Sequence, residues 1–100
     1  MEKQWMVYML ECADGTLYTG ITDDLRRRFI AHEEGRGAKY TRGRGPLNLR
    51  YCEPAGDKRA ALKRECAIKR LRRSEKLELI RDNQAQTEHL LPKGEVEIEC

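Results

Sequence analysis

The start of the chain holds the pattern that most restricts its fold. Residues 5–12, WMVYMLEC, form an apolar run, and residues 17–21, LYTGI, form a second one after the segment ADGT at 13–16. An apolar run of this length between polar segments indicates a buried strand. Asp-Gly is a strong hairpin-turn signal. The sequence therefore predicts that the domain opens with an antiparallel hairpin.

A helix is expected to follow the hairpin, over about residues 23–34. Thr22 is the expected N-cap residue, and the acidic residues after it favour the positive end of the helix. Leu25 and Phe29 lie four positions apart and form the apolar stripe of this helix.

A third strand is predicted over residues 47–53, LNLRYCE, where apolar and polar residues alternate. We expect Pro54 and Gly56 to end it. With the hairpin, this strand gives a small three-stranded sheet that helices must cover. The expected fold class is therefore α+β.

Two further helices are predicted after the third strand. Asp57 begins the first of them, over roughly residues 57–72, and Ser74 caps the second, over about 75–83. The inward-facing candidates on the first of these helices are Leu62, Cys66 and Leu71.

The length and composition favour one domain with a small core, because 37% of the 100 residues are charged. We assign residues 1–83 to this domain and residues 84–100 to an acidic, flexible tail. No apolar run reaches the length of about 18 residues that a membrane helix needs. The first residues lack a secretory pattern. We therefore expect a cytoplasmic protein with no membrane partner.

The four cysteines show no Cys-x-x-Cys spacing and no close pairing with histidine. This pattern argues against a zinc finger. In a cytoplasmic protein the thiols are expected to be reduced. Cys12, Cys52 and Cys66 fall in apolar stretches and are expected to act as small core residues.

Positive charge is concentrated in the middle of the chain. Residues 24–50 hold eight basic and three acidic residues, and residues 57–76 hold nine basic and three acidic ones. Such a block suggests a polyanionic partner. Solvated helix faces would give the same pattern, so this alternative stays open.

A basic, glycine-rich segment, GRGAKYTRGRGP, lies at residues 35–46. A loop of this length in a small domain is often functional. We expect its cations to bind the nucleic-acid backbone, with the glycines allowing close approach. These cations are Arg36, Lys39, Arg42 and Arg44. A disordered surface segment is the alternative.

The candidate reactive residues are few, because no Walker loop, Gly-x-Ser-x-Gly or His-Glu-x-x-His motif is present. Tyr8 and Tyr18 lie on the two hairpin strands, and Arg28 and His32 lie one helical turn apart. Glu65 lies among basic residues. Each of these also has an ordinary structural explanation, as strand packing, a solvent-facing pair or a helix ion pair.

The order and spacing of these motifs resemble those of the GIY-YIG nuclease superfamily. VYML at residues 7–10 and LYTG at 17–20 resemble its paired motifs, and TDDLRRRFIAH at 22–32 resembles its helix with Arg-x-x-x-His. The segments at 35–46 and 61–71, the latter ALKRECAIKRL, resemble the small single-domain bacterial branch of YhbQ-like proteins. The resemblance covers roughly residues 5–80.

The resemblance implies a three-stranded antiparallel sheet flanked by helices, and it implies roles for particular residues. Tyr8 and Tyr18 match the motif tyrosines, Arg28 matches the arginine that binds the scissile phosphate, and His32 matches the residue one turn later. Gly20 matches the glycine at which a side chain would crowd the site.

Tyr40 is a further site candidate, and Glu65 matches the single carboxylate that binds a divalent metal, Mg²⁺ or Mn²⁺. One carboxylate suits such an ion weakly in the absence of substrate, since the ion keeps waters and takes phosphate oxygens as ligands. We expect Tyr8 to position or deprotonate the attacking water, and we expect the site residues to converge on one exposed cleft.

The expected function is therefore a divalent-metal-dependent DNA endonuclease that hydrolyses phosphodiester bonds in DNA repair or recombination. Branched or single-stranded DNA is the expected substrate, with RNA and the oligomeric state left open. One alternative is a nucleic-acid-binding module with little or no turnover. A second is a structural or regulatory protein whose basic face binds an acidic protein.

Overall fold

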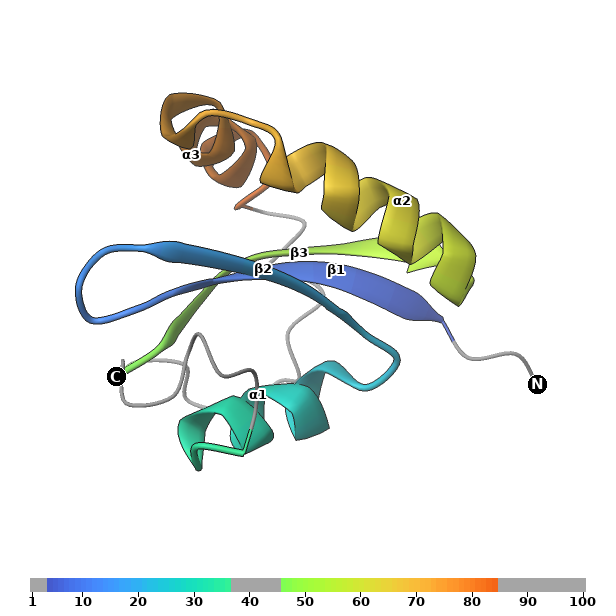
Figure 1. Ribbon diagram of the computed structural model, residues 1–100, viewed down its shortest axis with the longest axis horizontal. Coiled ribbons are helices and arrows are strands. Elements are labelled where there is room, and N and C mark those ends of the chain that lie inside the picture. The colour runs from blue at the N-terminus through green and yellow to red at the C-terminus, as the bar shows by residue number, and fades with distance from the viewer. Residues whose placement is uncertain (1–3, 37–45, 85–100) are drawn as a thin grey trace.

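A computed structural model describes residues 4–36 and 46–84 of the chain. It is an α+β fold in which a three-stranded antiparallel sheet is flanked by helices, as predicted (Figure 1). The elements are β1 (Trp5–Glu11), β2 (Leu17–Thr22), α1 (Leu25–Glu33), β3 (Asn48–Gly56), α2 (Lys58–Lys69) and α3 (Arg73–Asp82).

The strand order is β2-β1-β3, so the most apolar strand lies in the centre of the sheet and β2 and β3 form its edges. The predicted hairpin is present, with Tyr8 opposite Gly20 in the register of β1 and β2. On the other side of β1, Tyr8 is opposite Cys52 of β3. This register fixes which side chains share a face.

The helices cover both faces of the sheet, α1 on one side and α2 with α3 on the other (Figure 1). Successive side chains of a strand point to opposite faces. Tyr8 and Leu10 therefore pack in one core with Phe29 of α1, whereas Val7 and Met9 pack in a second core. The helical members of this second core are Ala61, Ile68 and Ile80.

The N-cap of α1 differs from the predicted one. Asp24 caps the helix, because its side chain accepts a hydrogen bond from the backbone N–H of Arg27 at 3.1 Å. Thr22 ends β2 instead, and its hydroxyl accepts a hydrogen bond from the backbone N–H of Asp24 at 3.0 Å. The threonine thus shapes the turn that leads into the helix.

The third strand runs further than predicted, because Pro54 and Gly56 lie within β3. A proline removes one backbone donor, which an edge strand tolerates. The register shifts between Trp5 and Met6, so that Met6 is opposite Pro54 and Trp5 is opposite Gly56. A bulge therefore accommodates the residues that were expected to end the strand.

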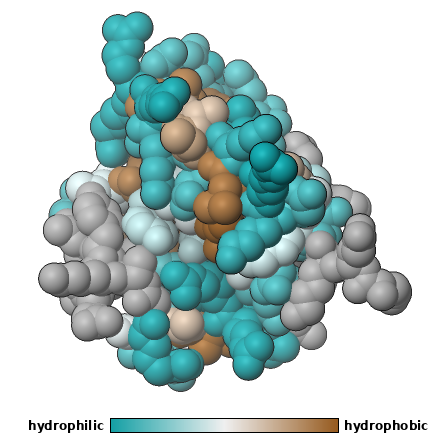
Figure 2. All heavy atoms as spheres, turned by 45° about the vertical axis from the view of Figure 1, so that its right-hand side comes forward, coloured by the Kyte–Doolittle hydropathy of each residue, from teal (hydrophilic) through white to brown (hydrophobic). Residues whose placement is uncertain are grey.

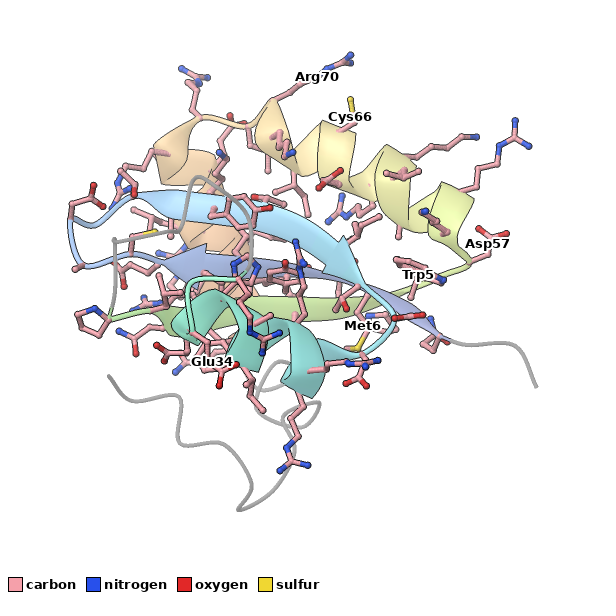
Figure 3. All side chains as sticks on the ribbon, turned by 60° about the horizontal axis from the view of Figure 1, so that its bottom comes forward. Trp5, Met6, Glu34, Asp57, Cys66 and Arg70 are labelled. Carbon is pink, nitrogen blue, oxygen red and sulfur yellow. The ribbon has the colours of Figure 1, made fainter. Side chains whose placement is uncertain are left out.

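The N-cap of α2 is Asp57, as predicted, and its side chain accepts a hydrogen bond from the backbone N–H of Ala60 at 2.8 Å. The predicted inward face was wrong, because Leu62 is 46% exposed and Cys66 is also exposed. Figure 3 shows Cys66 pointing away from the sheet. Ala61 and Ile68 face the core instead, and Leu71 is half-buried beyond the end of the helix.

The start of α3 also differs from the prediction. Ser74 lies inside the helix, and the backbone N–H of Arg72 donates a hydrogen bond to the side chain of Glu75 at 2.9 Å. The acidic tail was predicted from residue 84 onward, and its residues 85–100 lie outside the described part of the chain.

The surface is largely polar, as the high content of charged residues requires. Figure 2 shows hydrophilic side chains over most of one face, around smaller apolar areas. Within residues 4–36 and 46–84, no helix is long and apolar enough to cross a membrane. Cys12 and Cys52 are buried, in agreement with their predicted place in the core.

Candidate active site

Two tyrosines, an arginine and a histidine come together on the face of the sheet that α1 covers. Tyr8 and Tyr18 come from β1 and β2, and Arg28 and His32 come from α1. The ring centroids of Tyr8 and Tyr18 are 6.4 Å apart, and that of His32 lies 5.9 Å from the first and 5.4 Å from the second. The predicted convergence of these four side chains is therefore present.

Hydrogen bonds link three of these side chains in a row. The Nε–H of Arg28 donates to the hydroxyl oxygen of Tyr8 at 3.4 Å, and that hydroxyl lies 2.9 Å from Nε2 of His32. Tyr18 also makes a hydrogen bond with Arg28 and, like that of Tyr8, this bond raises the pKa of the guanidinium. Arg28 is therefore held as a cation against the two phenols.

The burial of these groups decides their charge at neutral pH. Burial raises the pKa of Tyr8 to about 12, although the hydrogen bond from Arg28 acts in the opposite direction. Burial and the charge of Arg28 lower the pKa of His32 to about 4. The phenol is therefore protonated and the imidazole neutral. We assign the phenol as the donor to Nε2, with the proton of the imidazole on Nδ1.

Glycine is required at position 20 because the phenol of Tyr8 occupies the space of a side chain there. A Cβ atom at Gly20 would lie 2.6 Å from the hydroxyl oxygen of Tyr8 and 3.1 Å from the ring of Tyr18. Atoms separated by so little cannot both remain in place. The glycine thus lets the Tyr8 ring lie against the backbone of β2.

We expect His32 to make the protein less stable as the pH falls from about 6.5 to 4. The unfolded chain binds a proton to this imidazole below its ordinary pKa of about 6.5, whereas the folded chain binds it only below about 4. The unfolded state therefore takes up more protons in this window, and stability decreases by roughly 3 kcal/mol.

NMR titration of the His32 ring, together with urea unfolding at pH 7 and pH 4.5, measures this effect. The ring resonances should change near pH 4. A midpoint near 6.5 would show that His32 is not held neutral by its surroundings.

Glu65 does not join the hydrogen-bonded group. It lies on α2, which covers the opposite face of the sheet, and its carboxylate is 3.4 Å from the ammonium of Lys69. Its side chain is 19% exposed. Its charge still reaches Tyr8, where it contributes to the raised pKa of the phenol.

The outer edge of β2 connects Glu65 with the tyrosines. Because β2 is an edge strand, groups from the two faces are separated there by a single strand. Tyr18 and Lys69 line one hollow at this edge, and Lys69 is the ion-pair partner of Glu65. The prediction that Glu65 shares one exposed cleft with the two tyrosines, Arg28 and His32 was therefore wrong, because Tyr8 and His32 are buried and Glu65 lies on the helix across the sheet.

The donor set fits a weakly held divalent ion and not a protein cage. Among the residues that the structure describes, no three His, Cys, Asp or Glu side chains gather in one place. The half-buried carboxylate of Glu65 is a hard oxygen ligand. Such a ligand suits Mg²⁺ or Mn²⁺ when waters and phosphate oxygens complete the coordination.

A larger basic hollow of about 980 Å³ lies beside Arg28, between the end of β2 and α1. Its cations are Arg26, Arg27, Arg28 and Arg36, which outnumber the two carboxylates, Asp23 and Asp24, and Trp5 also lines it. Arg36 is exposed and forms an ion pair with Glu34. Tyr40, Lys39, Arg42 and Arg44, also predicted as site residues, lie outside the described residues.

The sequence that forms this fold matches a known catalytic domain. Residues 4–78 match the GIY-YIG catalytic domain family, so the chain belongs to that family. This match confirms the resemblance that the paired tyrosine motifs indicated. A GIY-YIG catalytic domain implies nuclease-type activity.

Several similar proteins are named UPF0213. The chain is 50% identical over 80 residues to one from Oceanobacillus iheyensis and 51% identical over 83 residues to one from Clostridium perfringens. These matches cover 80% and 83% of the chain, and 93% and 89% of the relatives. The solution NMR structure of a UPF0213 protein from Bacillus halodurans is 45% identical, with a TM-score of 0.51, over 78% of this chain and 83% of that one.

Proposed function

We propose that this protein is a divalent-metal-dependent DNA endonuclease that hydrolyses phosphodiester bonds. The observation that carries the proposal is the hydrogen-bonded row of Arg28, Tyr8 and His32 beneath Gly20. It combines a cation for the phosphate with a phenol held in one orientation. The GIY-YIG catalytic domain supports nuclease chemistry at this place.

Arg28 is the phosphate-binding group in this proposal. Its guanidinium is a planar fork that suits phosphate oxygens. Hydrogen bonds to two phenols hold it at the site. It therefore neutralises charge on the phosphate both before and during the attack.

Tyr8 is proposed to position the attacking water and to keep its own proton. Transfer of the phenol proton to His32 would move it from a group with a pKa of about 12 to a group with a pKa of about 4. That transfer costs on the order of 11 kcal/mol. The oxygen of Tyr8 instead accepts a hydrogen bond from the attacking water, and the phenol keeps its proton in the hydrogen bond to Nε2 of His32. The proton that the water loses on attack passes to bulk water.

Glu65 is proposed to hold the metal, with waters and phosphate oxygens as the other ligands. The bound ion would supply charge neutralisation at the scissile phosphate and at the leaving oxygen. Its affinity without substrate is expected to be low, since Lys69 already neutralises this carboxylate.

The proposed substrate is branched or single-stranded DNA, with a role in DNA repair or recombination. The basic hollow beside Arg28 supports a polyanionic strand as the partner. The test uses flap, branched and single-stranded DNA oligonucleotides, and an RNA of the same sequence, with Mg²⁺, Mn²⁺ or EDTA. Cleavage that requires the metal supports the proposal, and cleavage of none of these substrates contradicts it.

We expect Arg28→Ala to lower both binding and cleavage. The arginine contacts phosphate in the ground state and in the transition state, so its loss weakens both. Cleavage should fall by roughly a hundredfold or more. The dependence of affinity on salt should become shallower, by about one in the slope of log K against log salt.

Arg59→Ala is the control for this change, because Arg59 is an exposed cation on α2. It removes the same charge from the molecule. Equal losses in the two variants would mean that Arg28 acts only through the overall charge.

A nucleic-acid-binding module with little turnover is the second candidate. The position of Glu65 on the helix across the sheet, already paired with Lys69, favours it. It predicts that the protein binds DNA in a salt-dependent way and cleaves none of the substrates, with or without added metal. The cleavage assay above separates the two candidates.

A further inference from the structure

A second, smaller hollow lies at the edge of β2 on the side of α2 and α3. Its volume is about 300 Å³. The residues that line it are Leu17, Tyr18, Thr19, Lys69 and Lys76. It thus brings together cations from two helices and a hydroxyl from the sheet, and the GIY-YIG motifs assign none of these three groups.

The hydroxyl of Thr19 is a buried donor without a partner. Thr19 is 3% exposed, and its Oγ1 forms no hydrogen bond within the described structure. Tyr18 and Gly20 face α1, so the side chain of Thr19 between them faces the α2 side, where the hollow lies. A buried hydroxyl that makes no hydrogen bond costs free energy. We therefore expect a ligand to supply the hydrogen-bond partner that the described residues do not.

The two lysines supply charge to the same hollow. Lys76 is half-buried and forms no ion pair with any residue of 4–36 or 46–84. Lys69 is 54% exposed and pairs with Glu65 at 3.4 Å. Glu65 offsets part of the charge of Lys69, which leaves Lys76 as the cation without a counter-ion.

We propose that this hollow binds a backbone phosphate of the nucleic-acid strand, held by Lys69, Lys76 and the hydroxyl of Thr19. A phosphate diester offers unshared oxygens to all three donors, and it fits a hollow of this size. The inference rests on the proposed function, since it assigns a second phosphate of the same substrate.

Tyr18 lies between the proposed position of this phosphate and that of the phosphate at Arg28. It lies in the tyrosine and histidine cluster and also lines the hollow. A strand bound at both places therefore crosses the outer edge of β2 beside Tyr18. It would pass Glu65, which is the ion-pair partner of Lys69. The hollow thus sets the register of the strand relative to the cleaved bond.

Lys76→Ala and Thr19→Val test this site with a labelled single-stranded DNA oligonucleotide. Loss of the lysine should weaken binding roughly tenfold, and loss of the hydroxyl roughly fivefold. The salt slope should become shallower by about one for Lys76→Ala and should not change for Thr19→Val. Lys63→Ala, which removes an exposed lysine of α2 outside the hollow, is the matched control and should bind as the wild type does.

Thr19→Val also gives a readout that damage to the fold would not give. Removal of an unpaired buried hydroxyl should raise the melting temperature while DNA affinity falls. A parallel NMR titration with inorganic phosphate should shift the amide signals of Thr19 and Lys76 in the wild type only. Unchanged DNA affinity in both variants, or no shift at these amides, would overturn the proposed phosphate site.

The outcomes keep this inference apart from the proposed nuclease activity. If the wild type cleaves nothing but Lys76→Ala loses affinity, the phosphate site stands and the nuclease proposal fails. If the wild type cleaves DNA and both variants bind and cleave as it does, the nuclease proposal stands and the phosphate site fails.

Discussion

Glu65→Gln is expected to reduce DNA cleavage roughly a thousandfold or more, since a catalytic metal supplies several kcal/mol and each 1.36 kcal/mol is tenfold in rate. The substitution keeps the shape of the side chain and removes its charge. Folding should change little, because the partly exposed ion pair with Lys69 contributes no more than about 0.5 kcal/mol. Cleavage with Mg²⁺ or Mn²⁺ and binding in EDTA measure the two effects separately.

DNA affinity in EDTA should be unchanged or slightly higher for Glu65→Gln, because an anion is removed from a basic surface. Glu78→Gln is the control, since Glu78 is an exposed carboxylate of α3 that pairs with Arg81. Cleavage by Glu65→Gln at the wild-type rate would place the metal elsewhere or reveal a contaminating nuclease.

The sheet could be predicted from sequence because its signals are local. The two apolar runs and the Asp-Gly turn between them predict the hairpin, and the structure supplies its register, in which Tyr8 is opposite Gly20. Arg28 and His32 are one helical turn apart, so any helix there places them together. The fold class and the grouping of Tyr8 and Tyr18 with the helix pair could therefore be predicted from the sequence and the family resemblance.

The errors arose where packing between elements decides the outcome. Leu62 and Cys66 form an apolar pair on one side of α2, but the helix packs through Ala61 and Ile68, whose smaller and β-branched side chains fit against the sheet. Pro54 is compatible with a strand only because β3 lies at an edge. Neither fact can be read from the local sequence.

The same reason limits prediction of the candidate site. Glu65 is identified by its motif, but its place on the far side of β2 depends on how α2 crosses the sheet. Thr19 and Lys76 carry no motif, and they are neighbours only through the packing of α3 near β2. The burial that makes His32 neutral is likewise a property of the folded chain.

Tyr8→Phe is expected to reduce the cleavage rate by roughly a hundredfold or more without a matching loss of DNA affinity. The change removes one oxygen atom, and with it the acceptor of the Arg28 hydrogen bond and the donor to His32. If Tyr8 positions the attacking water, kcat falls and KM changes little, because the phenol acts after the strand is bound. Folding should be weakened by about 1–3 kcal/mol, since Nε2 of His32 is left buried without a donor.

Tyr51→Phe is the matched control for this change. Tyr51 is 2% exposed, and burial with its Glu53 contact raises its pKa to about 12, as burial does for Tyr8. It packs with Val7 and Met9 on the opposite face of the sheet. The two variants therefore lose the same atom from similar surroundings, and urea unfolding should show comparable losses of stability. A comparable fall of kcat in both would assign the effect to the stability of the fold, whereas a fall confined to Tyr8→Phe assigns it to the water that the phenol holds.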